Sequence, residues 1–391
     1  MSMRAFIVLL DNFPGVSRLP GALCASGFEV GAICHPSAYL AQTRCLVRHF
    51  RWPQLQHRSR ILGALAAAIT AFAPDLIIPG DQRSVTLLQD LASGKITHRH
   101  ITASIITTIR TSLGDPAGYE ERLNKGATCR AALELGLAVP EASPVSRVED
   151  ALRFADDFGY PMVLKRDLGA AADGVRVCQD EPATRRHFSE LMSARRPESA
   201  LRRLARTLRG NYLNDCHLGS DNSINAVRFV PGPVAMRAVA TWRGEVVAGL
   251  SAVKEVVHPS PLGPSTIVRF VDNPEMEATV SALVKRWGSS GFLSFDFIIS
   301  SQDGHAYLLE CNPRPVPICH FGDFSGSNLC ASLASAMTGG PKSIPAQPTV
   351  ERVALFPQEW RRDPVSHWLK DAYHDVPWDD PKLLRALCTG T

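Results

Sequence analysis

The sequence predicts a multidomain α/β and α+β protein, with a parallel sheet first and a mixed arrangement of strands and helices after it. Three observations support this fold class. The chain has 391 residues, enough for two or three domains of about 150 residues each. Short apolar runs alternate with helical stretches up to residue 112, as in a parallel sheet covered by helices. Strand-like runs then dominate residues 223–299.

Composition and charge disfavour several classes of function. The sequence has 42 Lys and Arg residues against 38 Asp and Glu residues, a net charge of +4, so nothing in it favours binding to nucleic acid or to a membrane surface. The 10 cysteines include no CxxC pair, which disfavours a zinc ribbon and fits a reducing, cytoplasmic location. The first apolar run, residues 5–10, is too short for a signal peptide, and no stretch is long enough to span a membrane.

Residues 1–113 are predicted to form a Rossmann-like domain. The loop after its first strand, Asp11 to Gly15, lacks the GxGxxG pattern that brings a dinucleotide to a helix N-terminus. A nicotinamide dinucleotide site is therefore disfavoured here. The strands are expected at 5–10, 28–34 and 76–79, and the helices at 19–25, 59–72 and 84–91.

Residues 113–118 are rich in Gly, Pro and Asp and are predicted to link this domain to three further segments. These are a compact α+β unit at 114–222, a sheet with one helix on it at 223–340, and a tail at 341–391. The second segment should contain helices at 123–135, 148–158 and from about 182, and strands at 161–166 and 175–178. The third should contain a helix at 274–287 and strands at 224–230, 234–242, 245–253, 265–270, 292–299 and 306–312.

The last two of these strands carry the strongest chemical signal. Side chains alternate along a strand, so Glu310 and Asn312 point to one face. Asp296 lies opposite Glu310 if the hairpin has a three-residue loop 302–304 with a left-handed Gly304, but on the other face if the loop has two residues. In the first case two carboxylates and an amide oxygen converge, and Mg²⁺ or Mn²⁺ suits such oxygen ligands. Ion pairs with nearby arginines are the structural alternative.

A second signal is a strand that ends in Lys165 and is followed by small residues. The loop contains Gly169, Ala170, Ala171 and Gly174, whose minimal side chains let backbone N–H groups approach phosphate oxygens while the lysine supplies positive charge. It is not a Walker loop, because no Lys-Ser or Lys-Thr pair follows Gly174. A plain turn is the alternative.

Several basic residues lie where they could meet an anion. Arg237, Lys254 and Arg269 stand in apolar strands, and Arg314 follows the predicted hairpin. Each alone is as easily explained by a structural ion pair, but together they could stabilise negative charge that develops on a phosphate or carboxylate. Eight arginines between residues 185 and 209 form a further basic cluster, most simply a solvated helix face.

The order of these features resembles the ATP-grasp superfamily. The resemblance covers residues 115–339 or so, and the first domain is similar to the one that precedes the ATP-grasp domain in that family. It implies two lobes that hold ATP between two sheets. The matching segments are Asn124-Lys125, Val139-Pro140, the strand 159–165 with its small-residue loop, the segment around Phe295-Asp296-Phe297-Ile298, and Leu309-Glu310-Cys311-Asn312-Pro313-Arg314, which is the most specific.

The resemblance also implies roles for individual residues. Arg314 would hold the transferred phosphoryl group or the intermediate; Arg237 and Lys254 are candidate catalytic residues from their place in apolar strands and not from the resemblance. Two departures from the family pattern are alanines in place of loop glycines and the lack of an acid after Gly232. Contacts to the nucleotide are implied for Lys125, Lys165, and the backbone of Phe229 and Val230, and contacts to the metal for Asp296, Glu310 and Asn312.

An ATP-dependent carboxylate–amine ligase is the function that this resemblance implies. MgATP would phosphorylate a small-molecule carboxylate, and an amine would displace phosphate from the acyl phosphate to give an amide, with ADP as the second product. A homodimer is a further expectation. The sequence contains no GxSxG elbow or HExxH motif that would indicate hydrolysis. Two alternatives stay open: another phosphoryl transfer or a carboxylation at the same site, and a nucleotide-binding regulatory protein without turnover.

Overall fold

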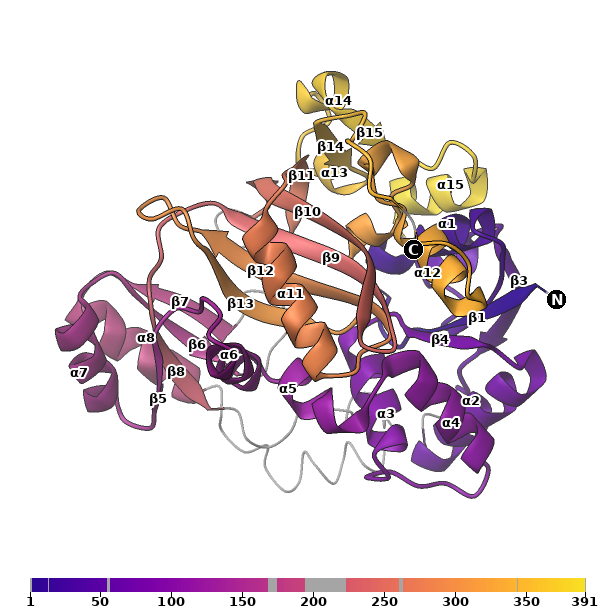
Figure 1. The fold of residues 1–391 in the computed structure, drawn as a ribbon, viewed down its shortest axis with the longest axis horizontal. Helices are drawn as coiled ribbons and strands as arrows, with labels where there is room; N and C mark the ends of the chain where they lie inside the picture. The colour runs from indigo at the N-terminus through magenta and orange to yellow at the C-terminus, as the bar shows by residue number, and fades with distance from the viewer. Residues whose placement is uncertain are drawn as a thin grey trace.

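The computed structural model describes residues 2–12, 14–54, 57–167, 174–193, 223–259, 263–342 and 344–390. Within these residues the strands form three sheets (Figure 1). A four-stranded sheet belongs to the N-terminal domain, a second four-stranded sheet forms a small lobe, and a seven-stranded sheet forms a large lobe between them. Residues 168–173 and 194–222 lie outside the described residues. The first segment contains Gly169, Ala170 and Ala171 of the predicted small-residue loop, and the second contains most of the arginine cluster.

The N-terminal sheet is parallel, in the order β3-β2-β1-β4, which is that of the first four strands of a doubly wound α/β sheet. Helices α2 to α4 pack on one face, and α1 lies on the other. Strand β3 and helix α4 were not predicted, and the first strand begins and ends two residues early. The elements are β1 (Met3–Val8), α1 (Leu19–Ala25), β2 (Phe28–Cys34), β3 (Leu46–Arg51), α2 (Arg58–Phe72), β4 (Leu76–Pro79), α3 (Gln82–Ala92) and α4 (Ala103–Leu113).

The small lobe has an antiparallel sheet in the order β5-β8-β6-β7, covered on one face by two helices. Met162 and Leu164 of β6 point into this core, so Lys165 points to the opposite face. The strand predicted at 224–230 ends at Arg228 and pairs with β5 and β6, so it belongs to this sheet and not to the large one. The elements are β5 (Ala142–Val145), α7 (Val148–Phe158), β6 (Met162–Arg166), β7 (Val175–Cys178), α8 (Glu181–Ser193) and β8 (Ile224–Arg228).

Two short helices connect the N-terminal domain to the small lobe. Helix α5 (Tyr119–Leu123) is followed by α6 (Lys125–Glu134), whose first turn is capped by Asn124 through a 2.9 Å bond from Ala127 N–H to Asn124 Oδ1. Ala131 and Ala132 of α6 are buried in the core of the large lobe. Helix α6 therefore holds Lys125 at the junction of the two lobes.

The large sheet has the order β13-β12-β9-β10-β11-β14-β15. Helix α11 covers one face, and α12 with the N-terminal domain covers the other. The tail adds the last two strands, and Asp375 of β15 fastens it by pairing with His320 and Arg18 at 2.9 and 3.1 Å. The elements are β9 (Val234–Trp242), β10 (Glu245–Val257), β11 (Ser265–Phe270), α11 (Pro274–Arg286), β12 (Gly291–Ile299), β13 (Ala306–Asn312), α12 (Leu329–Thr338), β14 (Arg352–Leu355), α13 (Gln358–Arg362), α14 (Trp368–Asp371), β15 (Tyr373–Asp375) and α15 (Pro381–Thr389).

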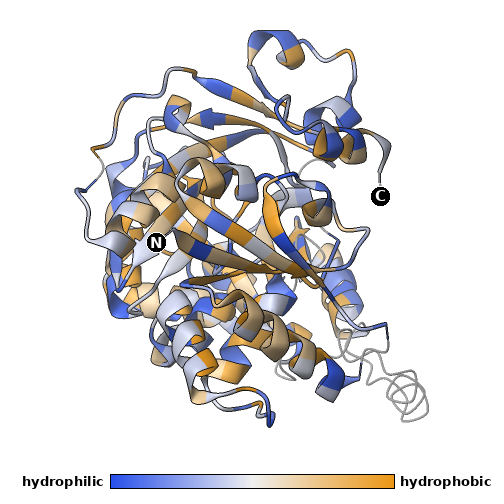
Figure 2. Ribbon diagram, turned by 90° about the vertical axis from the view of Figure 1, so that its right-hand side faces the viewer, coloured by the Kyte–Doolittle hydropathy of each residue, from blue (hydrophilic) through white to orange (hydrophobic). Residues whose placement is uncertain are grey.

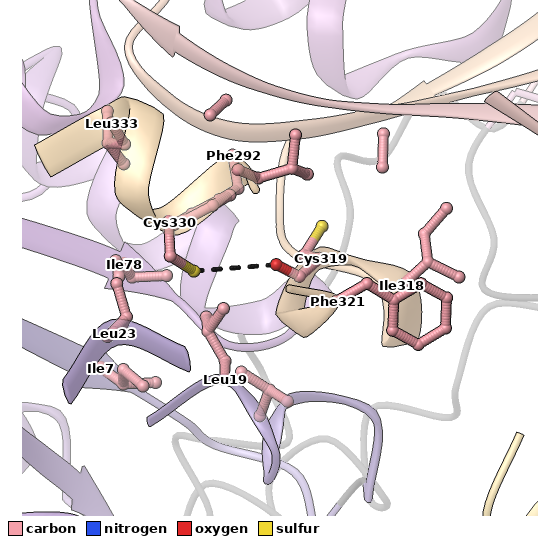
Figure 3. Packing of buried hydrophobic residues seen from close by; sticks show 14 of the residues in the cluster. Ile7, Leu19, Leu23, Ile78, Phe292, Ile318, Cys319, Phe321, Cys330 and Leu333 are labelled. Carbon is pink, nitrogen blue, oxygen red and sulfur yellow. Dashed lines mark hydrogen bonds between the residues drawn. The ribbon is translucent and has the colours of Figure 1, made fainter. Parts of the chain in front are cut away.

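One hydrophobic core joins the N-terminal domain to the large lobe. Figure 3 shows Ile7 and Leu23 of the first domain facing Phe292 and Leu333 of the large lobe across this core. Apolar residues follow the central strands in Figure 2, and polar residues alternate with them on the outer helices. A shared core of this kind fixes the large lobe against the face of the N-terminal sheet that α1 covers. None of the helices in the described residues is long and apolar enough to cross a membrane.

Candidate active site

The β12–β13 hairpin places Asp296 opposite Glu310 and Ser294 opposite Asn312. Of the two arrangements that the sequence left open, the structure therefore has the one in which two carboxylates and an amide share one face. The loop has neither of the two lengths considered: Ser300 N–H donates to His305 C=O at 2.9 Å, which leaves the four residues 301–304 in the turn. Gly304 has the left-handed φ of 78° that the prediction required.

With a four-residue loop and a regular strand, Asp296 would pair with Leu309; a β-bulge shifts the pairing by one residue, so that Asp296 pairs with Glu310. Next to the turn Phe297 pairs with Leu308, whereas one residue further along Asp296 pairs with Glu310, so Leu309 is the extra residue of the bulge. The carbonyl of Leu309 accepts a 2.8 Å hydrogen bond from Lys165 Nζ and a 3.6 Å bond from Cys129 Sγ. The irregular strand thereby fixes a lysine of the small lobe beside the two carboxylates.

Glu310 is held between two lysines from different elements. Its Oε2 lies 2.7 Å from Lys125 Nζ at the start of α6 and 3.8 Å from Lys165 Nζ at the end of β6. Burial alone would raise the pKa of Glu310, but the charges of Lys125, Lys165 and Lys254 outweigh it and hold the pKa at about 2. Glu310 is therefore a carboxylate at any physiological pH, as a metal ligand must be.

Asp296 forms an ion pair with a different lysine, Lys254. Lys254 of β10 reaches across β9 and places its Nζ 3.0 Å from Asp296 Oδ1. Asn312 lies on the same face and donates weakly from Nδ2 to Glu310 Oε1 at 3.4 Å. Lys254, Asp296 and Asn312 thus lie together with Glu310, which decides for Lys254 a placement that the sequence left open.

Arg314 follows the hairpin directly and faces the same region. Its Nη1 donates to the Pro315 carbonyl at 3.3 Å, while its Nε is buried and has no hydrogen-bond partner among the described residues. Burial lowers the pKa of Arg314, and the nearby carboxylates of Asp81, Asp296 and Glu310 act in the opposite direction. A buried guanidinium with an unused donor is suited to hold an anion.

Arg237 does not belong to this group, contrary to the prediction. Its Nη1 donates to Ser251 Oγ at 2.8 Å, and its Nη2 lies 3.3 Å from Glu277 of α11. Met236, the neighbour of Arg237 on β9, pairs with Asp296, so Arg237 points to the opposite face of the sheet. Arg269 also faces away and pairs with Glu255 at 3.5 Å. Sequence alternation alone does not say which strand residues share a face across a sheet.

The predicted adenine contact lies at the crossing from the small lobe to the large lobe. Phe229 and Val230 follow β8 and precede β9, and their backbone groups have no hydrogen bond within the part of the chain that the structure describes. Gly174 is buried at the start of β7, where an added Cβ would come within 3.1 Å of Arg166. The nucleotide roles of these three residues stay predictions.

Two residues near the lysines were not predicted. Asp167 is 4% exposed and accepts hydrogen bonds from Gly126 N–H at 3.1 Å and Asn225 Nδ2 at 2.7 Å. Cys129 lies one turn after Lys125 on α6, and burial raises the pKa of its thiol. Asp167 follows Lys165 by two residues, which is the one sequence signal that could have drawn attention to it.

The donor set fits a magnesium ion. Its members are two carboxylates that face each other on neighbouring strands and the amide of Asn312, all oxygen donors of the kind that Mg²⁺ prefers. Among the described residues no group of three or more His, Cys, Asp and Glu side chains could hold a metal, so these two carboxylates with substrate oxygens and water would have to complete the shell. Asp296, Glu310 and Asn312 are the residues that would bind it.

Comparison with known proteins agrees with this geometry. Residues 124–201 match the family model for the ATP-binding domain of the carbamoyl-phosphate synthase L chain. The carbamoyl phosphate synthase large chain of Vibrio cholerae is 22% identical over 245 residues, which is 62% of this chain and 20% of that protein. The same enzyme from Renibacterium salmoninarum is 23% identical over 269 residues, 66% of this chain and 21% of that one. The chain thus spans about a fifth of the length of these relatives.

Solved structures resemble almost the whole chain. Biotin carboxylase from Campylobacter jejuni aligns with a TM-score of 0.61 at 16% identity and covers 89% of this chain and 73% of its own. N5-carboxyaminoimidazole synthetase from Staphylococcus aureus aligns with a TM-score of 0.58 at 12% identity and covers 88% and 79%. Identities this low establish the fold. The match of residues 124–201 adds to this fold a sequence similarity to an ATP-binding domain.

Proposed function

We propose that this protein is an ATP-dependent ligase that joins a small-molecule carboxylate to an amine through an acyl phosphate. One observation carries the proposal: Lys125, Lys165 and Lys254 converge on the cross-strand carboxylates Asp296 and Glu310, each within 4 Å of one of them. Phosphoryl transfer is catalysed mainly by positioning and charge neutralisation, and this cluster supplies both cations and metal-binding oxygens. ADP and phosphate would be the other products.

The residues divide the work between the lobes. Lys165 from the small lobe and Lys125 from α6 would bind and orient the phosphates, while Arg314 would bind the oxygens of the transferred group through its unused Nε donor. A bound Mg²⁺ would neutralise charge on the phosphate oxygens. Lys254 would stabilise the carboxylate that attacks, because its ammonium group already lies beside Asp296 at the same face.

The carboxylate substrate, which accepts the phosphoryl group, would bind beside Arg314, next to the N-terminal domain. In the order β3-β2-β1-β4, successive strands are added on one side of β1 up to β3, and β4 is then added on the other side. Open α/β sheets bind ligands at such a switch in strand order, outside the carboxyl ends of the strands. Asp81 after β4 accepts from Asp11 N–H at 2.8 Å, and its charge acts on Arg314. Asp11 after β1 and Arg83 of α3 form an ion pair at 2.5 Å, which would offer one charge of each sign to a polar substrate.

A second candidate reaction uses bicarbonate as the acid. Two of the similar solved structures are named as a biotin carboxylase and an N5-carboxyaminoimidazole synthetase, and a third is a carboxylase domain bound to MgADP and bicarbonate. The chemistry at the site would be the same, with carboxyphosphate as the acyl phosphate and an N-carboxylated amine as the product. That carboxylase is a dimer, and a homodimer is equally a prediction for this chain.

Product analysis with MgATP tests the proposal and separates the two candidates. Purified protein is incubated with a panel of carboxylic acids, amino acids and bicarbonate, and ADP, AMP and phosphate are quantified beside the Glu310→Ala variant. ADP that forms with one acid and one amine, and is lost in the variant, supports amide ligation. ADP that forms with bicarbonate and an amine supports carboxylation. AMP as the product, or Mg²⁺-dependent turnover unchanged in Glu310→Ala, would refute the proposed mechanism.

A further inference from the structure

Asp167 lies next to the candidate site and has no role in the proposed chemistry, yet its carboxylate accepts three hydrogen bonds. It follows β6 directly, two residues after Lys165, and only 4% of its surface is exposed. Its Oδ1 accepts from Gly126 N–H at 3.1 Å and from Asn225 Nδ2 at 2.7 Å, and its Oδ2 accepts from Ser223 Oγ. A buried carboxylate is costly unless it is fully hydrogen-bonded, and this one has three donors.

These bonds tie together the elements that carry the two nucleotide lysines. The backbone of Asp167 adds two more bonds, from Lys125 N–H to its carbonyl at 3.3 Å and from its own N–H to the Ser223 carbonyl at 3.0 Å. Helix α6, strand β6 and strand β8 therefore meet at a single residue. The carboxylate also lies at the N-terminus of α6, where negative charge is favoured by the helix dipole.

The fit around this residue is tight. Gly126 is the second residue of α6, and a Cβ added to it would lie 2.6 Å from Asp167 Oδ1. Gly126 has an ordinary helical backbone and not a positive φ, so an alanine would normally favour the helix. The close approach of the carboxylate to the helix is thus what requires glycine here.

We infer that Asp167 is a positioning residue that fixes the first turn of α6 so that Lys125 reaches Glu310 beside Lys165. This inference rests on the proposed nucleotide site for its consequence, although the contact it explains, 2.7 Å between Lys125 Nζ and Glu310 Oε2, belongs to the chain alone. Without the carboxylate, the N–H of Gly126 and the amide of Asn225 lose their acceptor, and of its bonds to residue 167 the first turn of α6 keeps only the backbone bond from Lys125 N–H to the carbonyl. The position of Lys125 beside Glu310 is then less well fixed.

The test uses the full chain and reads Lys125 directly. Brief labelling with acetic anhydride, quantified by peptide mass spectrometry, compares Lys125 with the exposed Lys382 as an internal reference. The variants are Asp167→Ala, Asp167→Asn and Gly126→Ala, with Asp180→Ala as the matched control, because Asp180 is an exposed cap of α8 that accepts from Ala183 N–H at 2.8 Å. MgADP affinity by calorimetry and the melting temperature are measured for each protein.

Asp167→Ala and Gly126→Ala should raise Lys125 labelling several-fold over wild type and weaken MgADP binding about tenfold, while Asp180→Ala changes neither. Asp167→Asn keeps the shape and one oxygen to accept from Gly126 and Asn225, but it replaces the oxygen that accepts from Ser223 by an N–H donor, so its labelling and its MgADP affinity should fall between those of Asp167→Ala and wild type. Wild-type labelling of Lys125 in both Asp167→Ala and Gly126→Ala, with near-normal melting temperatures, would overturn the inference. Failure of the wild type itself to bind MgADP would refute the proposed function, whereas the labelling would still decide the role of Asp167.

Discussion

The substitution Glu310→Gln probes the electrostatics of the site through protein stability. The lysine charges lower the pKa of Glu310 from 4.5 to about 2. Because the pKa is lower in the folded chain than in the unfolded chain, the carboxylate stabilises the fold above pH 4.5, and this contribution is lost as the pH falls from 4.5 to about 2. At about 1.4 kcal/mol per pKa unit, the carboxylate contributes about 3 kcal/mol at pH 7. Glutamine mimics the protonated acid and should remove it.

Urea denaturation followed by tryptophan fluorescence measures this difference, since the chain has 6 tryptophans. Glu310→Gln should be less stable than wild type by about 3 kcal/mol at pH 7, and the gap should shrink to roughly half by pH 3. Glu245→Gln is the control, because Glu245 pairs with Lys342 at an exposed site and should change stability by less than about 1 kcal/mol. A gap below about 1 kcal/mol at pH 7, or one that does not depend on pH, would refute the reasoning.

Two further outcomes separate the residues that share the site from those that do not. Lys254→Met should lower turnover by about a hundredfold or more. Arg237→Met should leave turnover within about twofold, because Arg237 lies on the far face of the sheet and its partner Glu277 has a side chain that is 60% exposed and stays solvated without it. Equal losses of turnover for the two variants in initial-rate assays would contradict this placement of Arg237. Mn²⁺ binding, followed by the signal of the free ion in electron paramagnetic resonance, should be at least about tenfold tighter with ADP than without it, because Lys125 and Lys254 hold the two carboxylates. Equal Mn²⁺ affinity with and without ADP would contradict the idea that the lysines compete with the metal for the two carboxylates.

Much of the fold could be predicted from residue patterns because most elements have local signals. Strands β2, β4 and β9 and helices α1 and α7 match the predicted ranges, since each has a clear apolar period and a Gly or Pro near its end. Strand β3 was missed because it has no buried residue and includes three basic side chains, so its sequence lacks a clear apolar pattern. The assignment of β8 to the small sheet failed for another reason, because sheet membership depends on long-range pairing that no local pattern encodes.

The site could be predicted only as far as the chain itself places residues together. Glu310 and Asn312 share a face by alternation, and the pairing of Asp296 with Glu310 followed from one of two hairpin geometries. The structure reaches that pairing by a four-residue turn and a bulge at Leu309, a combination that the residue count does not distinguish from the predicted loop. Arg237 and Lys254 looked equivalent in sequence, yet the stagger of the strands sends them to opposite faces.

Lys125 and Lys254 also affect how a metal ion and a nucleotide would bind at the site. Facing carboxylates on neighbouring strands repel one another, and here Lys125 and Lys254 supply the neutralising charge, at 2.7 Å from Glu310 and 3.0 Å from Asp296. A metal ion alone would have to displace both ammonium groups and leave them without a partner in a half-buried site, which is unfavourable. Phosphate oxygens that arrive with the metal offer the lysines new partners, so the two exchanges favour each other. Under the proposed function, the cluster would therefore couple metal binding to nucleotide binding through charge balance, without a movement of the lobes.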